Sequence, residues 1–502
     1  MKTFKFFLKF FIISACFVVF TVIAGCELFN VSGPDEPDTG YASPWSGEIS
    51  SFGNVGPRAA VATADDPEDA VYVSPDGKDN GADGSIGKPY KSINSALAAA
   101  SPGATIVLRG GTYKEGRDVR VRKSNITIKS AKGEWAIIDL TTYNSGHGED
   151  SAVEFYAEDE TTRGIVKDCK LQSVEVMGGF YAVCFETKWE WGQTDRNGAS
   201  DIIIEDCVLH DSRNDTVKIK PGCDNITIRY CEIYNSGRAY TGYSDFKSGE
   251  RNSEGIDNVN GGNMHVHNNH IHDICSNGVY AKGGALDVLI ENNLVERTYG
   301  AGIMAGFDTS PQYFNLKVNP KYYENIRGIV RNNLIIDTGW EGIGLYASMD
   351  AEVYNNTVVN AVTYGTGKYH SPIYFGVATQ DWNNPSGCPP NVNPDIHHNI
   401  VSQPSSYTGR MIEVRYVKPG DVYAASLSAL DGSPVMSNNC YYIAGKSSAF
   451  SDNRPPAKTN MGLSAWQAHI GGDSGSIEAD PVFDTGYGAG NPECAGMGIQ
   501  SF

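Results

Sequence analysis

The segment VLIENNLV (288–295) is one copy of a repeat that decides the fold. Apolar residues alternate through it, and Asn293 follows at a fixed place. Such alternation predicts strands with one buried face. Eight further segments match, with Asn or Cys at the same place: GIVKDCKL (164–171), IIIEDCVL (202–209), ITIRYCEI (226–233), MHVHNNHI (264–271), GIVRNNLI (328–335), AEVYNNTV (351–358), PDIHHNIV (394–401) and PVMSNNCY (434–441). The aligned residues are Cys169, Cys207, Cys231, Asn269, Asn293, Asn333, Asn356, Asn399 and Asn439.

The spacing of the copies predicts a solenoid. The closest copies are 23 or 24 residues apart, and the others are 38 to 43 apart. A period near 23 fits one coil of three short strands, and the longer spacings fit a coil with a loop insertion. The sequence therefore predicts an all-β fold, a right-handed parallel β-helix. A β-sandwich would explain neither the period nor the fixed Asn and Cys.

The fixed position predicts a ladder inside the solenoid. Strands of successive coils stack about 4.8 Å apart, so equivalent residues lie above one another. An inward Asn can bond the coils above and below through its side-chain amide, and a Cys there is a small apolar filler. Nine cysteines remain beyond Cys16 and Cys26, with no CxxC pair, so neither a disulfide framework nor a zinc site is indicated.

Both ends of the solenoid need a cap, because an open edge invites strand addition. The stretch SINSALAAA (92–100) predicts an N-terminal cap helix, and the strand Thr105–Leu108 follows it. Residues 460–502 predict an irregular C-terminal cap. The expected organisation is thus a leader at 1–25, a disordered tether at 26–67, the β-helix at 68–459 and its C-terminal cap at 460–502.

The N-terminus reads as an export signal. Three lysines precede the apolar run 10–24, which ends in VIAGC (22–26). That ending resembles the bacterial lipoprotein cleavage box, which implies lipid on Cys26. We therefore expect an exported protein that is anchored to a bacterial membrane, at the outer membrane or cell surface, or secreted. The alternative is an uncleaved membrane anchor.

The charge limits the partners. The formal net charge is −19, and the first 25 residues carry no acid, so the rest of the chain is more acidic still. Such a chain repels nucleic acid and anionic membranes, so we expect no nucleic-acid partner. We also expect a monomer. An acidic polysaccharide would also be repelled, unless a cation or a local basic patch reverses the sign.

Candidate site residues lie on the strand that precedes each repeat. Five strand segments align on an apolar residue that faces the core: Val217, Ile256, Val279, Ile303 and Ile343. By alternation, the next residues share the outer face: Lys218, Asp257, Tyr280 and Met304. Lys220 and Lys282 lie two residues further along that face, and Asp215 and Glu254 stack at the turn that enters it.

The stretch from Tyr72 to Tyr113 (YVSPDGKDNGADGSIGKPYKSINSALAAASPGATIVLRGGTY) resembles the start of many extracellular β-helix polysaccharide lyases, especially polysaccharide lyase family 9. Repeats of the V-x-NN-x-I type occur in β-helix lyases and epimerases alike. The resemblance implies β-elimination on a uronic acid polymer such as pectate or alginate. It also implies Ca²⁺ and a lysine base.

The family motifs carry over with departures. NGVYAKGG (277–284) is similar to the family's NGFKLGG, with the lysine displaced by two places, which makes Lys282 the base. SEGID (253–257) resembles its calcium-binding DDGID, which makes Glu254 and Asp257 calcium ligands and Asp215 a third. Lys220 is the second candidate base. Lys218, Arg251 and Tyr280 are the expected substrate-binding residues.

The residue types suit this chemistry. The proton next to a sugar carboxylate is weakly acidic, so a cation must neutralise that carboxylate while negative charge builds up. Several carboxylate oxygens suit Ca²⁺. A lysine base must be neutral, and neighbouring cations lower a lysine pKa from its usual value of about 10.4.

Other assignments remain open. A glycoside hydrolase needs two carboxylates about one bond, a role that Glu254 and Asp257 could fill. A uronan epimerase and a non-catalytic carbohydrate-binding surface protein also fit the solenoid. The four histidines His265, His267, His270 and His272 invite a zinc site, but His267 aligns with Glu291 and Arg331, which favours ordinary outward positions.

Overall fold

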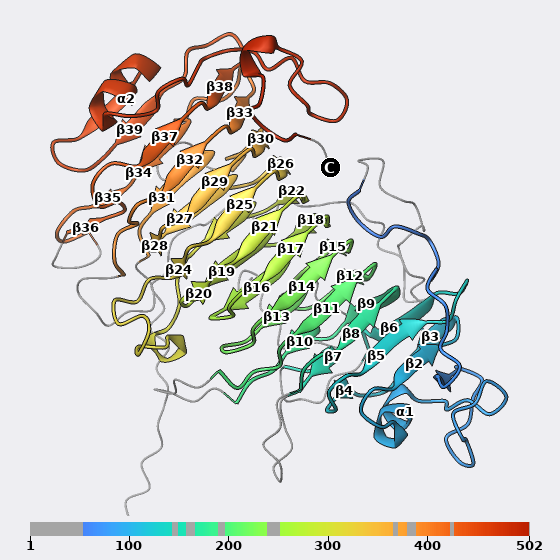
Figure 1. Cartoon of the computed structure of the whole chain (residues 1–502). Helices are drawn as coiled ribbons and strands as arrows, with labels where there is room; N and C mark the ends of the chain where they lie inside the picture. The colour runs from blue at the N-terminus through green and yellow to red at the C-terminus, as the bar shows by residue number, and fades with distance from the viewer. Residues whose placement is uncertain are drawn as a thin grey trace, which may run out of the picture. The chain divides into compact units, whose positions relative to one another are not determined.

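Three long sheets of short strands make up the fold (Figure 1). The computed structural model describes residues 54–142, 149–156, 166–188, 196–237, 252–364, 370–378, 388–421 and 426–500. The predicted leader, the lipidation residue Cys26 and Arg251 lie outside these residues. Among the described residues, no helix is long and apolar enough to cross a membrane.

Each coil contributes one strand to each of the three sheets, and one additional strand lies at the start of the first sheet and another at the end of the third. The first sheet holds β1 (Val71–Val73), β2 (Thr105–Leu108), β5 (Thr127–Ser130), β8 (Lys170–Gln172), β11 (Ile202–Glu205), β14 (Ile226–Arg229), β17 (His265–His267), β21 (Leu289–Glu291), β25 (Ile329–Arg331), β29 (Glu352–Tyr354), β32 (Asp395–His397) and β37 (Val435–Ser437). The second sheet holds β3 (Gly111–Tyr113), β6 (Ala136–Leu140), β9 (Val174–Gly178), β12 (Val208–His210), β15 (Glu232–Tyr234), β18 (His270–Ile274), β22 (Leu294–Thr298), β26 (Leu334–Ile336), β30 (Thr357–Val359), β33 (Ile400–Gln403) and β38 (Cys440–Ile443).

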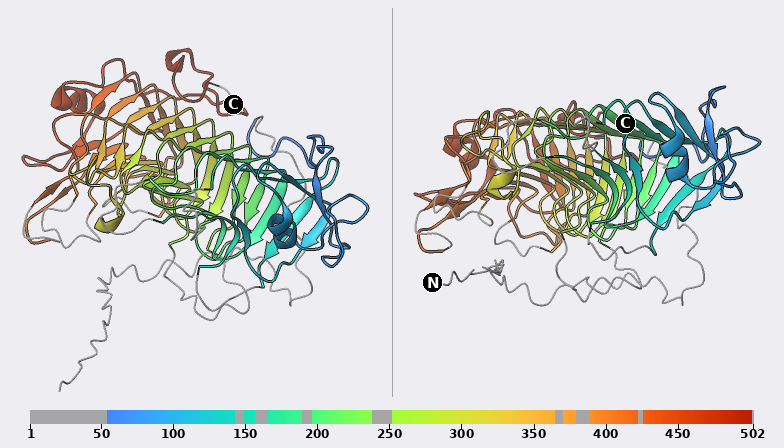
Figure 2. Two further views of the ribbon diagram at one scale, coloured as in Figure 1. Left: turned by 60° about the horizontal axis from the view of Figure 1, so that its bottom comes forward. Right: turned by 90° about the horizontal axis from the view of Figure 1, so that it is seen from below.

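The third sheet holds β4 (Val119–Val121), β7 (Ser151–Phe155), β10 (Tyr181–Phe185), β13 (Val217–Ile219), β16 (Ile256–Val259), β19 (Val279–Lys282), β23 (Ile303–Ala305), β27 (Ile343–Tyr346), β31 (Ile373–Gly376), β34 (Ile412–Val414), β39 (Phe450–Asp452) and β40 (Lys458–Met461). Neighbouring strands of the three sheets pair in parallel, except β39 with β40. Figure 2 shows the coils side by side in chain order. The predicted all-β parallel β-helix is confirmed.

Two small sheets lie in the loops. One joins β20 (Ala285–Leu286), β24 (Asn325–Ile326) and β28 (Ser348–Met349), and the other pairs β35 (Tyr416–Val417) with β36 (Leu427–Ser428). Two short 3-10 helices, η1 (Pro311–Tyr313) and η2 (Pro492–Cys494), complete the irregular parts.

The core is a column of aligned apolar side chains. Val217, Ile256, Val279, Ile303 and Ile343 pair in register from one coil to the next, as predicted, and all are fully buried. Their alternation with polar residues fixes the register, because a slip of one residue would turn every core side chain outward.

The asparagine ladder is confirmed by its hydrogen bonds. Asn293 donates through Nδ2 to Oδ1 of Asn333 over 2.9 Å, and its backbone N–H donates to the same oxygen over 3.1 Å. The same pair of contacts links Asn333 to Asn356 and Asn356 to Asn399. These amides satisfy backbone groups that would otherwise be buried without partners.

One predicted rung is wrong. Cys169 pairs at the level of Ile202, because β8 aligns Lys170 with Ile203. Val174 occupies the ladder position instead, one coil before Cys207. Each coil has two turns with a left-handed residue, and this explains the error. Asp168 and Asp201 are the left-handed residues of the first turn, whereas Ser173 and Asp206 are those of the second turn. The dipeptide Asp-Cys therefore occurs at the first turn in one coil (168–169) and at the second turn in the next (206–207), which makes Cys169 look equivalent to Cys207 in the sequence.

Helices close both ends of the described solenoid. α1 (Ile93–Ala99) begins at Ser92, whose side chain accepts a hydrogen bond from the backbone N–H of Ser95 over 3.0 Å. α2 (Leu463–Ile470) lies at the other end and buries Trp466, which stacks on Phe450 with ring centroids 5.6 Å apart. Both caps cover apolar edges of the core.

The end of the predicted tether differs from expectation. Residues 54–66 lie against the solenoid, as the dark blue trace shows in Figure 1. The backbone N–H of Gly56 donates to the carbonyl of Asn268 over 3.0 Å, and Arg58 Nε donates to Asp206 Oδ1 over 2.8 Å. Val55 is buried against Leu294 and Leu334. Low overall hydrophobicity hid these contacts, because backbone groups and a few single side chains such as Val55 and Arg58 make them.

Candidate active site

The predicted outer row exists on the third sheet. Lys218 pairs with Asp257, Asp257 with Tyr280, and Tyr280 with Met304. The row is not solvent-exposed, because Asp257, Tyr280 and Met304 are almost fully buried. Large side chains account for part of this difference, because Tyr346, Tyr374 and Phe307 pack against Tyr280 and Met304. Alternation assigns a face to a residue but does not predict what covers it.

Asp257 of this row lies in a group of three carboxylates. Asp215, Glu254 and Asp257 each offer an oxygen within 4.8 Å of the others, and all three side chains are buried. The backbone N–H of Glu254 donates to Asp215 Oδ1 over 3.0 Å, which holds the two consecutive coils together at the turn. The structure therefore brings the three predicted metal ligands together.

Lys218 lies among these carboxylates. Its Nζ donates to Asp215 Oδ2 over 3.1 Å and also to Asp257 Oδ2. Burial opposes its charge, but the two carboxylates outweigh burial and raise the pKa of Lys218 well above its ordinary value. Lys218 is thus a permanent internal cation that binds protein carboxylates.

Burial perturbs the acids in the opposite sense. It raises the pKa of Asp215 to about 7, with Lys218 lowering the pKa and Glu254 adding to the rise. Burial also raises the pKa of Asp257, against the lowering effect of Lys218 and Lys282. Such pKa shifts indicate a cluster of crowded carboxylates, whose ionised form a further cation would stabilise.

The cluster fits a hard cation. Glu254 Oε2 and Asp257 Oδ1 are buried oxygens without a hydrogen-bond partner among the described residues. Buried carboxylate oxygens normally find a partner, and Ca²⁺ prefers several such oxygens. Lys218 leaves these two oxygens open, although it already supplies one positive charge at the same place.

Lys282 stands beside the cluster on β19. Its Nζ donates to the hydroxyl of Tyr280 over 2.7 Å and lies 4.3 Å from the centre of that ring. Burial, followed by the nearby Asp257 and Glu254, raises the pKa of Tyr280 well above its ordinary value, so the phenol stays neutral. The structure therefore assembles Lys282, Tyr280 and Asp257 as one group.

Lys220 is placed differently from Lys282. Its Nζ contacts Glu186 Oε1 at 2.7 Å and Glu149 Oε2 at 3.2 Å. Burial lowers its pKa, but Cys184 and the carboxylates outweigh burial and raise the pKa well above the usual range. A lysine that is held charged in this way is poorly suited to serve as a base.

One residue near Lys282 escapes sequence reasoning. Glu324 is fully buried and accepts hydrogen bonds from the Gly283 N–H over 2.6 Å and from Thr309 Oγ1 over 2.7 Å. Burial raises its pKa to about 8. Glu324 thereby fixes the turn that follows Lys282. Nothing in the sequence signals this contact, because it joins residues 41 positions apart outside the repeat.

Two family models match the chain. The model described as Pel9A-like, right handed beta helix region matches residues 71–245, and that described as right handed beta helix region matches residues 197–375. The chain is a pectate lyase-like, right-handed β-helix protein. The predicted hand of the solenoid and the predicted resemblance are thereby confirmed.

Individual relatives are more distant or match over shorter stretches. Pectate lyase PEL9 of Emericella nidulans is 41% identical over 85 residues, which span 16% of this chain and 19% of that enzyme. The crystal structure of pectate lyase Pel9A is 15% identical and covers 71% of this chain and 80% of its own, with a TM-score of 0.44. The A-module of the Azotobacter vinelandii mannuronan C-5 epimerase AlgE6 is 12% identical and covers 78% and 94%, with a TM-score of 0.48.

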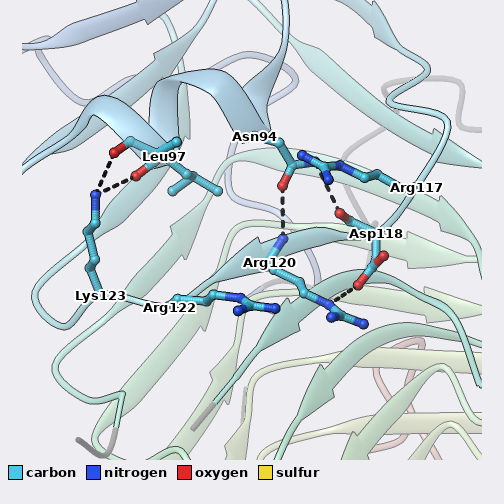
Figure 3. Close-up of a pocket in the computed structure, with 8 residues that line it drawn as sticks. Asn94, Leu97, Arg117, Asp118, Arg120, Arg122 and Lys123 are labelled. Atoms are coloured by element: carbon cyan, nitrogen blue, oxygen red, sulfur yellow. Dashed lines mark hydrogen bonds and ion pairs between the residues drawn. The ribbon is translucent and has the colours of Figure 1, made fainter. Parts of the chain in front are cut away.

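This β-helix protein also has a basic pocket beside α1 (Figure 3). The pocket has a volume of about 460 Å³ and is lined by Arg117, Arg120, Arg122 and Lys123 together with Asn94, Leu97, Ala98 and Asp118. Arg117 and Arg122 are exposed, whereas Lys123 Nζ donates to the Ala100 carbonyl at the end of α1 over 2.7 Å. The pocket is a local basic patch on an acidic chain.

The pocket shares a row with the carboxylate cluster. Arg120 pairs with Glu154, Glu154 with Cys184, Cys184 with Lys218, and Lys218 with Asp257. Four strand steps separate Arg120 from Asp257, which corresponds to about 19 Å at the usual strand spacing. The third sheet therefore carries both features on its outer face.

Proposed function

We propose that this protein is a polysaccharide lyase that cleaves a uronic acid polymer, such as pectate or alginate, by β-elimination. The observation that carries the proposal is the position of Lys282. Its amine lies against the Tyr280 hydroxyl, beside a buried carboxylate cluster, on the outer face of a pectate lyase-like solenoid.

Lys282 acts as the base in this proposal. Its neutral amine takes the proton next to the sugar carboxylate, and the electrons of that C–H bond form a new carbon–carbon double bond. The bond to the glycosidic oxygen breaks, and that oxygen leaves with the bonding electrons and takes up a proton from solvent to become the new hydroxyl end of the departing chain. Tyr280 positions the amine, while Glu324 holds the turn that follows it.

Asp215, Glu254 and Asp257 would hold Ca²⁺, with Glu254 Oε2 and Asp257 Oδ1 as the oxygens that have no other partner among the described residues. When bound, the ion would neutralise the substrate carboxylate next to the reacting carbon. Lys218 neutralises part of the same cluster from inside the protein. Substrate would then meet a site of reduced negative charge in an otherwise acidic chain.

The basic pocket would bind a more distant part of the polymer. Arginine recognises carboxylates through paired hydrogen bonds, and the pocket holds two exposed arginines, Arg117 and Arg122. This supports a substrate that carries a carboxylate on many of its sugars.

The deciding experiment is a product assay on a panel of uronic acid polymers. We expect the ultraviolet absorbance of an unsaturated uronate with at least one polymer, and its loss in Lys282→Ala. Lys321→Ala is the matched control, because Lys321 is exposed on the loop beside the site. An active Lys282→Ala variant would refute the assignment of the base.

Other products would redirect the proposal. New reducing ends without the ultraviolet signal would indicate a hydrolase, and a change in uronate composition without cleavage would indicate an epimerase. Binding without either would indicate a carbohydrate-binding surface protein.

We also propose that Cys26 carries lipid and anchors the exported protein to a bacterial membrane. The basic N-terminus, the apolar run and the VIAGC ending support this. Cys26→Ala should release the protein from the membrane fraction, and a variant that remains membrane-bound would argue for an uncleaved anchor.

A further inference from the structure

A second group of potential metal ligands lies on the second sheet, away from the site described above. Glu232 of β15, His270 and His272 of β18, and Glu296 of β22 share the outer face of three consecutive strands. Glu232 pairs with His270, and His272 pairs with Glu296. The residues between them, Ile233, Ile271 and Val295, face the core.

The contacts within this group run crosswise. His272 Nε2 lies 3.1 Å from Glu232 Oε1, and His270 Nε2 lies 2.9 Å from Glu296 Oε1. The two imidazole rings are 4.2 Å apart, and ligand atoms of Glu232, His270 and His272 all lie within 4.8 Å of one another. The four side chains are 12 to 19% exposed, so an ion can enter from solvent.

A further contact orients His272 as metal-binding histidines are oriented. Its Nδ1 lies 2.6 Å from Asp273 Oδ2, and Arg297 holds Asp273 at 2.9 Å. In a neutral ring, a proton on Nδ1 that is donated to Asp273 leaves the lone pair of Nε2 facing the Glu232 carboxylate. Two acceptors that face each other need a proton or a metal ion between them, and a carboxylate behind the histidine favours metal.

We propose that Glu232, His270 and His272 form a Zn²⁺ site that joins two successive coils. Two imidazole nitrogens and one carboxylate oxygen are protein ligands that zinc accepts, with water completing a tetrahedron. Glu296 of the next strand contacts His270 Nε2 at 2.9 Å, and Arg297 contacts Glu296 Oε1 at 2.6 Å. The site lies on a different sheet from Lys282.

The chain supplies its own control. His265 and His267 form a similar pair on β17, with rings 4.2 Å apart. His265 contacts Glu291 at 2.9 Å, but Arg331 also binds that carboxylate, and His267 contacts Asn268 instead of an acid. The only carboxylate that contacts this second pair among the described residues is therefore already bound by an arginine, and we expect the pair to bind zinc weakly.

The test is titration of the purified protein with Zn²⁺ by calorimetry, together with the visible spectrum of the Co²⁺ form. The wild type should bind one ion at the site, with a tetrahedral Co²⁺ spectrum free of thiolate charge-transfer bands. His270→Gln/His272→Gln should weaken binding about a hundredfold, while His265→Gln/His267→Gln should leave it unchanged. Circular dichroism of the metal-free variants checks that both fold.

Three results would overturn the proposal. The wild type could fail to bind, the two double variants could lose binding equally, or the His270→Gln/His272→Gln variant could keep wild-type affinity. Glu232→Gln provides a milder change for the case in which the double variant does not fold, and it should also weaken binding. None of these readouts depends on lyase activity.

Discussion

At the scale of single residues, the asparagine ladder is the main polar stabiliser of the interior. Asn333 accepts two hydrogen bonds from Asn293, and its Nδ2 donates to Ile290 O and Asn356 Oδ1, each with a length of 2.9 to 3.1 Å. Removing it leaves several buried groups without partners. By contrast, Cys231 fills the same position through its small size.

We therefore expect Asn333→Ala to lower the free energy of unfolding by about 3 kcal/mol, because unsatisfied buried groups each cost about 1 to 3 kcal/mol. Cys231→Ala should cost about 1 kcal/mol, since it removes one buried sulfur. Urea unfolding followed by circular dichroism compares the two. Equal losses would show that the amide network adds nothing beyond packing.

A buried histidine makes stability depend on pH. Burial lowers the pKa of His210, but hydrogen bonds to Asp211 at 2.9 Å and Glu175 at 3.1 Å outweigh it and raise the pKa to about 9. Because the folded pKa lies above the unfolded value near 6.5, the stabilisation is complete below pH 6.5. It is lost as pH rises towards 9, by up to about 3 kcal/mol.

The measurement is the urea midpoint at pH 6 and pH 9.5 for the wild type and for His210→Asn. The wild type should lose more stability than the variant over this range. A variant with the same pH response would show that other groups cause the loss.

At the scale of strands, register was the most predictable property. The apolar residues Val217, Ile256 and Val279 occur at matching places in the sequence, and pairing of the strands follows from them. The neighbours of these residues on the paired strands were therefore predictable too, including the approach of Lys218 to Asp257. The failure at Cys169 shows the limit, because one turn motif occurs twice within a coil.

Partner choice within a row was not predictable. Lys218 and Lys282 both lie near Asp257, yet Lys218 binds carboxylates and Lys282 binds a phenol. Which partner a side chain contacts depends on its length and on its burial, and the burial depends in part on residues outside the repeat. For the same reason, Glu324 could not be found, although it fixes the turn after Lys282.

Strand β19 supplies a prediction that separates positioning from binding. Tyr280→Phe keeps the ring beneath Lys282 but removes the hydroxyl that contacts Nζ. We expect kcat to fall about 10- to 100-fold with little change in KM, because only the amine loses its orientation. The test is steady-state kinetics on the polymer that the protein cleaves. An unchanged kcat would show that Tyr280 does not position Lys282.

At the scale of the whole solenoid, the basic pocket and the carboxylate cluster lie on one face about 19 Å apart. A long polymer reaches both, whereas a short oligomer reaches only one. We expect Arg117→Glu/Arg122→Glu to raise KM about tenfold for polymer and to leave short oligomers unaffected. The polymer effect should shrink at high salt, because the interaction is between exposed charges.

The matched control is Lys114→Glu, an exposed cation near the same end that does not line the pocket. Equal effects of the two changes would assign the result to general charge. Equal effects on polymer and oligomer would place the pocket within the reacting site itself.

Both ends of the described chain return to the middle of the solenoid. Ile499 packs with Val55 on Leu294, Leu334 and Ile336, while Gly498 and Gln500 bond to the coils at His398 and Asn332. A column of repeats ordinarily frays from its terminal coils, since each coil depends only on its neighbours. Here the segments around Val55 and Ile499 must first detach from interior coils before the terminal coils can unfold. We therefore expect a protease to open the described solenoid, residues 54–500, more slowly than a repeat whose terminal coils are held by their neighbours alone.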